Sequence, residues 1–355
     1  MADPGSLDRT VKRTATVTAM KVDGGIGGGL AKVAASAAKQ EERGYDGIWV
    51  AETAHDPFLP LLLAAQDTER LDLGTAIAVA FARNPMTLAQ VSWDLQAASQ
   101  GRFILGLGSQ IRAHITRRFS MPWSHPAPRM REMILAIRAI WDCWNDGTKL
   151  DFRGDFYQHT LMTPFFNPGP NPHGNARIFL AGVGQHMTEV AGEVADGFLC
   201  HGFTTRQYLD EVTLPALARG REKAGKAMDD FELCGPMFVV TGRDEAEMAT
   251  AATGVRGQIA FYGSTPAYRG VLDLHGWGDL QDELNRLSKE GRWAEMGELI
   301  DEDMLATFAV VAPIDEVAGK LVERWGDVLS RISFYTPYET SQDQLDGVIA
   351  ELKAA

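Results

Sequence analysis

Residues 71–108 have the sequence LDLGTAIAVAFARNPMTLAQVSWDLQAASQGRFILGLG, and this stretch decides the fold. It begins with an apolar run of strand length, Leu71–Ala80. Pro85 is typical of a first helical position, and Gly101 is typical of the residue that ends a helix. A second apolar run, Phe103–Gly108, follows. The stretch therefore predicts a strand, a helix and a second strand, which is the repeating unit of a parallel sheet.

The same alternation of short apolar runs and longer helical patterns continues on both sides of this unit. We predict eight strands: Val17–Val22, Asp46–Ala51, Leu71–Ala80, Phe103–Gly108, Arg177–Ala181, Gly197–His201, Phe231–Thr241 and Ile332–Tyr335. Nearly all are apolar throughout, as strands buried on both faces are. The strand count favours an α/β fold of the (β/α)8 TIM barrel type over an open doubly wound sheet.

Two segments interrupt this rhythm, and we predict that both are insertions in a single barrel domain covering residues 1–355. The first, about residues 150–172, is aromatic and rich in Pro and Gly, which predicts a hairpin or a loop. The second, about residues 263–305, has helical patterns with many charged residues and Trp.

The composition excludes several classes of protein. Hydrophobic residues make up 45% and charged residues 23%, which is an ordinary globular balance. A net charge of −13 disfavours nucleic acid and anionic membrane surfaces as partners. The three cysteines have no CxxC spacing, so neither a disulfide framework nor a zinc site is indicated. Residues 1–14 lack the apolar core of a secretion signal, and we expect a cytoplasmic protein.

In a TIM barrel the catalytic groups lie where the strands end, so the strand ends are the candidate site. Strand two is followed by Glu52 and His55, which are capable of acid–base chemistry. The alternative is that they only cap or brace the next helix. The eight histidines lack the spacing of metal ligands, so we expect no metal.

Glycine-rich turns follow strands four and five. After strand four, exposed backbone amides and two polar side chains can bind a ligand: Gly106, Gly108, Ser109 and Gln110. Strand five leads through a glycine turn into a helix, whose free N–H groups can hold a phosphate: Gly182, Val183, Gly184 and Gln185. A plain tight turn is the alternative there, and the third glycine of a Rossmann fingerprint is absent.

In order and spacing, these segments resemble the luciferase-like family of flavin and deazaflavin oxidoreductases, over about Val17 to Tyr335. The resemblance rests on Gly44-Tyr-Asp-Gly-Ile-Trp-Val-Ala-Glu52, Leu73-Gly-Thr-Ala-Ile77, Asn84-Pro85, Gly101-Arg-Phe-Ile-Leu-Gly-Leu-Gly108, Leu180-Ala-Gly-Val-Gly184 and Ala195-Asp-Gly-Phe198. The chain is most similar to the actinobacterial branch that depends on the deazaflavin coenzyme F-420 (F420).

The resemblance implies a homodimeric oxidoreductase that binds F420. It would transfer a hydride between the deazaflavin C5 and a small organic substrate, either an alcohol or carbonyl compound or an activated alkene. FMN is the alternative cofactor, in a luciferase-like monooxygenase. A non-catalytic flavin- or deazaflavin-binding protein is the second alternative.

The resemblance also implies roles for individual residues. A cis peptide bond between Ala76 and Ile77 would form a bulge that backs the ring system. The glycine-rich turns after strands four and five would contact the ring and hold the phosphate. His55 would be the general acid or base, with Glu52 as its orienter or as the alternative base.

The chain departs from the family pattern in two places. Where the glucose-6-phosphate branch has a His one residue after an Asp, this chain has Glu52-Thr53. Where a carboxylate often follows the strand-four glycines, it has Gln110-Ile111-Arg112. The sugar-phosphate mechanism therefore does not carry over residue by residue, and the substrate cannot be inherited from any member of the family. The anionic tail of F420 would need a basic groove, for which the candidates are Arg112, Arg117, Arg118 and Lys226.

Overall fold

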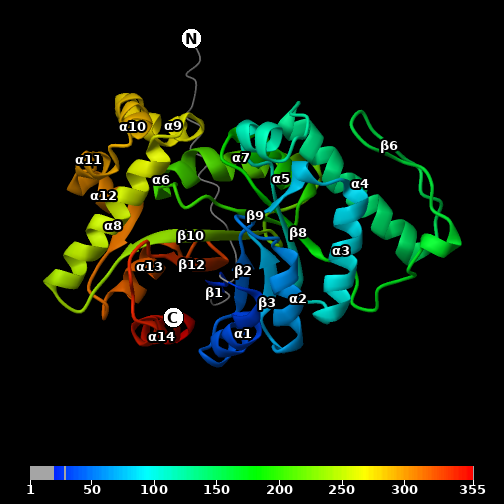
Figure 1. Ribbon diagram of the computed structural model, residues 1–355, viewed down its shortest axis with the longest axis horizontal. Coiled ribbons are helices and arrows are strands. Elements are labelled where there is room, and N and C mark those ends of the chain that lie inside the picture. Colours follow the sequence, from blue (N-terminus) through cyan, green and yellow to red (C-terminus); the bar gives the residue numbers. More distant parts are fainter. Residues whose placement is uncertain (1–19, 28, 355) are drawn as a thin grey trace, which may run out of the picture.

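The computed structural model describes residues 20–27 and 29–354, and its centre is a ring of parallel strands (Figure 1). Eight strands pair in the order β12-β1-β2-β3-β5-β8-β9-β10, and β10 pairs back with β12. Their bounds are β1 Lys21–Gly25, β2 Gly47–Val50, β3 Asp72–Thr75, β5 Phe103–Gly108, β8 Arg177–Ala181, β9 Gly197–Leu199, β10 Glu232–Val240 and β12 Arg331–Tyr335. The predicted (β/α)8 TIM barrel is therefore confirmed.

The predicted strands differ from the observed ones mainly at their boundaries. The first strand was expected at Val17–Val22, but β1 begins at Lys21, and residues 17–19 lie outside the described part of the chain. The run Leu71–Ala80 is divided between β3 and β4 (Ala78–Val79). Ala76 and Ile77 separate the two strands. β3 pairs with both β2 and β5, whereas β4 pairs only with β5.

Helices form a layer around the strands, as Figure 1 shows. Those that follow barrel strands are α1 Val33–Glu42, α2 Phe58–Gln66, α3 Pro85–Ala98, α4 Pro126–Asp146, α5 Gln185–Val194, α7 Leu214–Lys223, α8 Glu245–Gly263 and α14 Gln342–Ala354, which ends the described chain, and α13 Val317–Trp325 precedes β12. The start of α3 is set by Pro85 and by the Asn84 side chain, which accepts a hydrogen bond from the Thr87 N–H at 3.1 Å. Within the described residues, no helix is long and apolar enough to cross a membrane.

The helical segment after β9 changes its hydrogen-bonding pattern along its length. It consists of α6 (Arg206–Tyr208), a π-helical turn at Leu209–Thr213, and α7. Pro215 explains the change, because it has no N–H to donate to the preceding turn and its ring crowds the carbonyl four residues earlier. The wider π turn accommodates both effects.

The barrel interior below the strand ends is filled by apolar and charged side chains. Ile104, Phe179, Leu199 and Cys234 form an apolar cluster there. Arg331 is 0% exposed and pairs with Asp23 at 2.7 Å, Asp72 at 2.6 Å and Glu232 at 3.4 Å. These carboxylates come from β1, β3 and β10, so the ion-pair network ties distant strands together. Removing the Arg331 guanidinium would leave the buried Asp23 carboxylate without its cation, at a cost of about 3–5 kcal/mol.

The two segments that were predicted to be insertions, about residues 150–172 and 263–305, each form secondary structure outside the barrel. The first contains a short antiparallel hairpin, β6 (Phe152–Arg153) paired with β7 (Gln158–His159), which belongs to an arm projecting from the barrel in Figure 1. The second consists of the helices α9 Arg269–Leu274, α10 Gly278–Glu290, α11 Trp293–Glu298 and α12 Glu302–Phe308, followed by β11 Ala309–Val311. A separate apolar cluster packs these helices against α8.

Candidate active site

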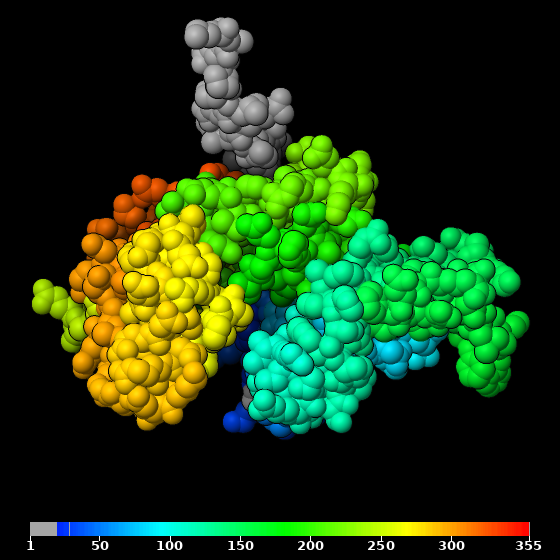
Figure 2. Space-filling view, turned by 90° about the horizontal axis from the view of Figure 1, so that it is seen from above, coloured from blue at the N-terminus to red at the C-terminus, as the bar shows by residue number. Residues whose placement is uncertain are grey.

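A cavity of about 1180 Å³ opens at the carboxyl ends of the barrel strands. Figure 2 shows it from above as a hollow between the segment that follows β5 and the insertion that follows α8, with the first strands at its base. Each barrel strand supplies a lining residue, within the strand or directly after it: Gly25, Ala51, Ala76, Gly108, Ala181, Leu199, Pro236 and Tyr335. The cavity therefore occupies the position where TIM barrel enzymes carry their active sites.

The structure brings nine of the ten predicted cofactor-binding residues to the wall of this cavity: Ala76, Ile77, Gly108, Ser109, Gln110, Gly182, Val183, Gly184 and Gln185. The tenth, Gly106, does not line it. A Cβ on Gly106 would lie 1.7 Å from the Thr75 carbonyl oxygen. The Thr75 hydroxyl donates to the Gly106 carbonyl at 2.7 Å and accepts from its N–H at 2.9 Å. Gly106 thus supports the segment that leads to Ala76.

The peptide bond between Ala76 and Ile77 is cis, which confirms the geometry that the family resemblance implied. The Ala76 N–H donates to the Val50 carbonyl at 2.9 Å, and the Ile77 carbonyl accepts from the Glu52 N–H at 3.2 Å. A Cβ on Gly108 would lie 2.8 Å from Cγ1 of Ile77, so the glycine makes room for that side chain. Ile77 and Gly108 together form one wall of the cavity.

The turn between β8 and α5 presents backbone N–H groups at the cavity. Gly184 is the N-cap of α5 and has an extended conformation, with φ −85° and ψ 149°. Its carbonyl accepts from the N–H groups of Met187 and Thr188, at 3.1 and 3.2 Å, and no side chain caps the helix. A Cβ on Gly184 would meet no atom within 4 Å. The positive end of a 10-residue helix therefore faces open space that an anion can occupy.

The structure places Glu52 and His55 outside the cavity lining. One carboxylate oxygen of Glu52 accepts from the Val79 N–H at 2.7 Å and from the Arg83 guanidinium at 2.6 Å, and its side chain is 7% exposed. Glu52 thereby braces the segment after Ile77. His55 lies on the loop between β2 and α2 and is exposed. The acid–base role of both residues stays a prediction.

Four side chains that the sequence reasoning did not single out form a hydrogen-bonded group on the cavity wall, which we call the tyrosine cluster: His201, Tyr262, Tyr268 and Tyr335. His201 and Tyr335 lie at strand ends, so the rule that located Glu52 could also have found them. Tyr262 ends α8 and Tyr268 lies in the following insertion. No local pattern places these two near the barrel mouth.

Hydrogen bonds fix the protonation pattern of the tyrosine cluster. The Phe203 N–H donates to Nδ1 of His201 at 3.0 Å, and Nε2 of His201 lies 3.2 Å from the Tyr268 hydroxyl. The Tyr262 and Tyr335 hydroxyls are 2.7 Å apart. Burial lowers the pKa of His201 to about 4, so the imidazole is neutral at pH 7. Burial also raises the pKa of Tyr268 to about 12, so its hydroxyl keeps its proton.

Charge is unevenly distributed along the cavity. The arginines that line it are Arg112 and Arg331, and Arg331 already forms ion pairs with Asp23 and Asp72. Of the four cations predicted to form an anion groove, Arg112 lines the cavity and Arg117, Arg118 and Lys226 do not. Arg118 instead donates to the Thr53 carbonyl. Among the described residues, no group of His, Cys, Asp and Glu is arranged to hold a metal ion.

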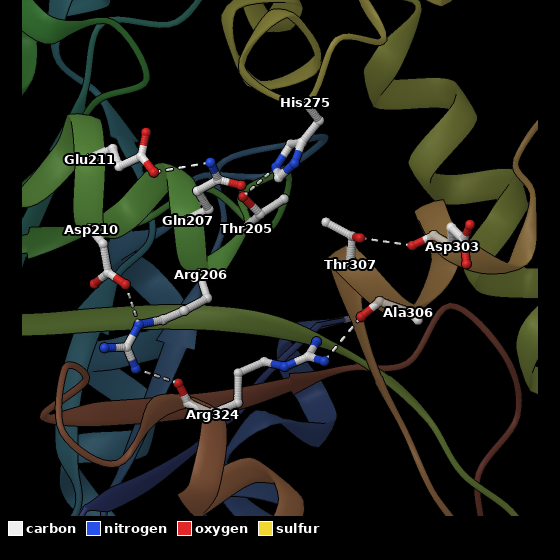
Figure 3. A pocket seen from close by; sticks show the side chains of 10 residues that line it. All are labelled: Thr205, Arg206, Gln207, Asp210, Glu211, His275, Asp303, Ala306, Thr307 and Arg324. Atoms are coloured by element: carbon white, nitrogen blue, oxygen red, sulfur yellow. Dashed lines mark hydrogen bonds and ion pairs between the residues drawn. The ribbon is translucent and has the colours of Figure 1, made fainter.

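A second pocket, of about 700 Å³, lies outside the barrel between α6 and the insertion helices (Figure 3). Its two arginines are already engaged. Arg206 pairs with Asp210 at 2.8 Å and with Asp327 at 2.6 Å, and Arg324 donates to the Ala306 and Ala309 carbonyls. The arginines of this second pocket are already bound to other groups of the protein, and the pocket lies away from the strand ends. We therefore take the larger cavity as the candidate active site.

Comparisons with known proteins agree with this geometry. The chain is 58% identical over 313 residues to an uncharacterized protein of Mycobacterium tuberculosis, which covers 88% of this chain and 92% of that protein. It is 31% identical over 268 residues to the F420-dependent glucose-6-phosphate dehydrogenase of Beutenbergia cavernae, which covers 71% of this chain and 76% of that enzyme.

The solved structure of the coenzyme F420-dependent tetrahydromethanopterin reductase from Methanopyrus kandleri has the same fold. It superposes with a TM-score of 0.75 at 19% identity and covers 95% of this chain and 98% of that one. The model of the luciferase-like monooxygenase family matches residues 12–329. On the strength of that match, the chain belongs to the luciferase-like monooxygenase family of enzymes.

Proposed function

We propose that the protein is an F420-dependent oxidoreductase that transfers a hydride between the deazaflavin and a small alcohol, carbonyl compound or activated alkene. The observation that carries this proposal is the convergence of the Ala76-Ile77 bulge, the β5 glycine turn and the β8–α5 turn on one cavity. When bound, the deazaflavin would supply a ring carbon that gives or accepts a hydride. The chain would supply binding, orientation and exclusion of water.

Individual residues would divide these tasks. The N–H groups at the start of α5, behind Gly184, would hold the phosphate. Ile77 would back the ring system, and Ser109 and Gln110 would hydrogen-bond to the ring or its side chain. Arg112 would pair with the anionic tail, because it is an exposed cation on the wall of the cavity.

The names of the relatives favour F420 over FMN. Both the B. cavernae enzyme and the M. kandleri reductase are named as F420-dependent. The cavity volume of about 1180 Å³ exceeds the roughly 300–1,000 Å³ of a typical single-ligand site. This volume supports an enzyme that binds cofactor and substrate together over a carrier whose cofactor fills the barrel mouth.

Turnover of a substrate panel tests the proposal. Purified protein would be mixed with F420 and a series of alcohols, and with reduced F420 and a series of aldehydes, ketones and enones. Visible absorbance of the deazaflavin would be followed. We expect a substrate-dependent absorbance change with F420 and none with FMN in its place. Oxygen-dependent turnover with reduced FMN, and none with F420, would favour the monooxygenase alternative.

We also propose a cytoplasmic homodimer. The three cysteines are free and buried, as in proteins of reducing compartments. The segment directly after the β6–β7 hairpin carries exposed apolar side chains, with Leu161 77% and Phe165 89% exposed, and a second copy of the chain would cover them. Light scattering on the wild type and on a variant with Phe165→Ser would test the dimer. A wild-type monomer would contradict it.

A further inference from the structure

The tyrosine cluster lies on the part of the cavity wall that β9, β12 and the insertion form, whereas Arg112 follows β5. His201 follows β9 and Tyr335 ends β12, whereas Tyr268 belongs to the short helical turn Pro266–Tyr268 of the insertion. The imidazole of His201 packs against the rings of Tyr262 and Tyr268, with centroids 4.7 and 4.5 Å away. The insertion thus completes a wall of aromatic faces and polar tips at the barrel mouth.

The hydrogen bonds leave two hydroxyl donors of the cluster free to face the cavity, that of Tyr268 and that of whichever tyrosine accepts in the Tyr262–Tyr335 pair. Nδ1 of His201 accepts from the Phe203 N–H, so in the neutral imidazole the proton is on Nε2. Nε2–H then donates to the Tyr268 oxygen at 3.2 Å. Since the Tyr268 oxygen is the acceptor in that contact, its own O–H is available to a third group. Tyr268 is therefore a hydrogen-bond donor whose orientation His201 fixes.

This part of the cavity wall offers no partner for a charged substrate. No lysine is among the described residues that line the cavity, and its two arginines are Arg112, which follows β5, and Arg331. The buried Arg331 is neutralised by Asp23 and Asp72. His201 is neutral because Nδ1 is occupied and the ring is buried among aromatic side chains. A phosphate or carboxylate placed here would be desolvated without compensation.

We propose that the tyrosine cluster is the substrate end of the cavity and selects an uncharged, ring-bearing ketone, enone or alcohol, whose oxygen accepts a hydrogen bond from the Tyr268 hydroxyl. Aromatic faces would pack the ring, and the Tyr268 donor would position the oxygen. The proposal rests on the proposed oxidoreductase function. We also expect that glucose 6-phosphate, the substrate in the name of the B. cavernae enzyme, does not bind at the tyrosine cluster.

Equilibrium binding to the F420-saturated protein tests this selection without relying on turnover. Three probes differ in one group each: acetophenone has the ketone, ethylbenzene lacks the oxygen, and 4-acetylbenzoate adds a carboxylate. Calorimetry would give the dissociation constant of each. We expect acetophenone to bind and 4-acetylbenzoate to bind roughly 100-fold more weakly or not at all.

The variant Tyr268→Phe removes the hydroxyl and keeps the ring. It should weaken acetophenone binding roughly 3- to 10-fold, the effect of one neutral hydrogen bond, and leave ethylbenzene and F420 binding unchanged. Tyr338→Phe is the matched control, because its hydroxyl donates to the Val239 carbonyl and does not line the cavity. For the positioning residue, His201→Gln keeps an N–H donor and should retain more acetophenone binding than His201→Leu.

Three results would overturn the inference: no acetophenone binding, equal binding of acetophenone and 4-acetylbenzoate, or unchanged acetophenone binding in Tyr268→Phe. Failure of the proposed function has a different signature. In that case F420 would not bind while FMN does, and the preference for acetophenone would persist in the FMN-loaded protein.

Discussion

The substitution Gly184→Asp separates folding from cofactor binding at the β8–α5 turn. Gly184 is the N-cap of α5, and its φ of −85° and ψ of 149° suit any L-residue. A side chain at this position meets no atom within 4 Å. Asp is among the preferred N-cap residues, so the variant should be as stable as the wild type or more stable by a few tenths of a kcal/mol.

The same carboxylate should strongly oppose a phosphate bound at the turn. Two unit charges about 4 Å apart interact by about 4 kcal/mol at an effective dielectric constant of about 20. Since about 1.4 kcal/mol corresponds to a tenfold change, the dissociation constant for F420 should rise by roughly 10²- to 10³-fold. The carboxylate would in addition occupy N–H groups that the phosphate needs.

Titration of deazaflavin fluorescence with wild type, Gly184→Asp and Gly184→Ala measures this effect, and thermal unfolding measures stability. Gly184→Ala is the matched control, since it adds a Cβ in open space without charge, and its affinity should stay within about threefold of the wild type. Wild-type affinity in Gly184→Asp would refute the phosphate site at α5. Loss of affinity in both variants would point to a steric effect instead.

Three further predictions concern the remaining candidate groups. His55→Ala tests the acid–base role predicted for this residue: that role predicts turnover roughly 10²-fold lower with F420 affinity nearly unchanged, and near-normal turnover, as the exposed position of His55 outside the cavity lining would allow, would contradict it. Arg112→Ala should weaken F420 binding and flatten its salt dependence, while Lys226→Ala, outside the cavity, should change neither; equal effects of both would rule out a specific contact. Burial holds the pKa of folded His201 at about 4, below about 6.5 in the unfolded chain, so the unfolded state binds more protons between these values and stability falls as pH falls from about 6.5 to about 4. In urea unfolding, the difference in unfolding free energy between wild type and His201→Gln should therefore shrink as pH falls through this window. A difference that does not change with pH would contradict a buried neutral imidazole.

The barrel could be predicted from the sequence because its strands are apolar on both faces and are separated by capped helices. Phe103–Gly108 and Arg177–Ala181 have the predicted bounds, since each is a short apolar run next to glycines. The division of Leu71–Ala80 is visible only in the strand pairing, because Ala76 and Ile77 are ordinary strand residues by composition. The family resemblance, rather than the local sequence, indicated the cis bond there.

The candidate site could be predicted only where consecutive residues of the chain form it. The glycine turns after β5 and β8 carry their own signal, and the structure brings them to one cavity. Glu52 was chosen by its place after a strand, but Arg83, which engages its carboxylate, lies 31 residues further along the chain. Tyr268 was missed because its position depends on how a long insertion packs over the barrel mouth.

Binding of F420 in preference to FMN is the property on which the proposed function depends most. The most direct test is a paired titration of the purified protein with each cofactor, under identical salt and pH, followed by calorimetry. We expect stoichiometric binding of F420 at least tenfold tighter than that of FMN, and loss of that binding in Gly184→Asp. Tighter binding of FMN, or no binding of F420 to a folded protein, would contradict it.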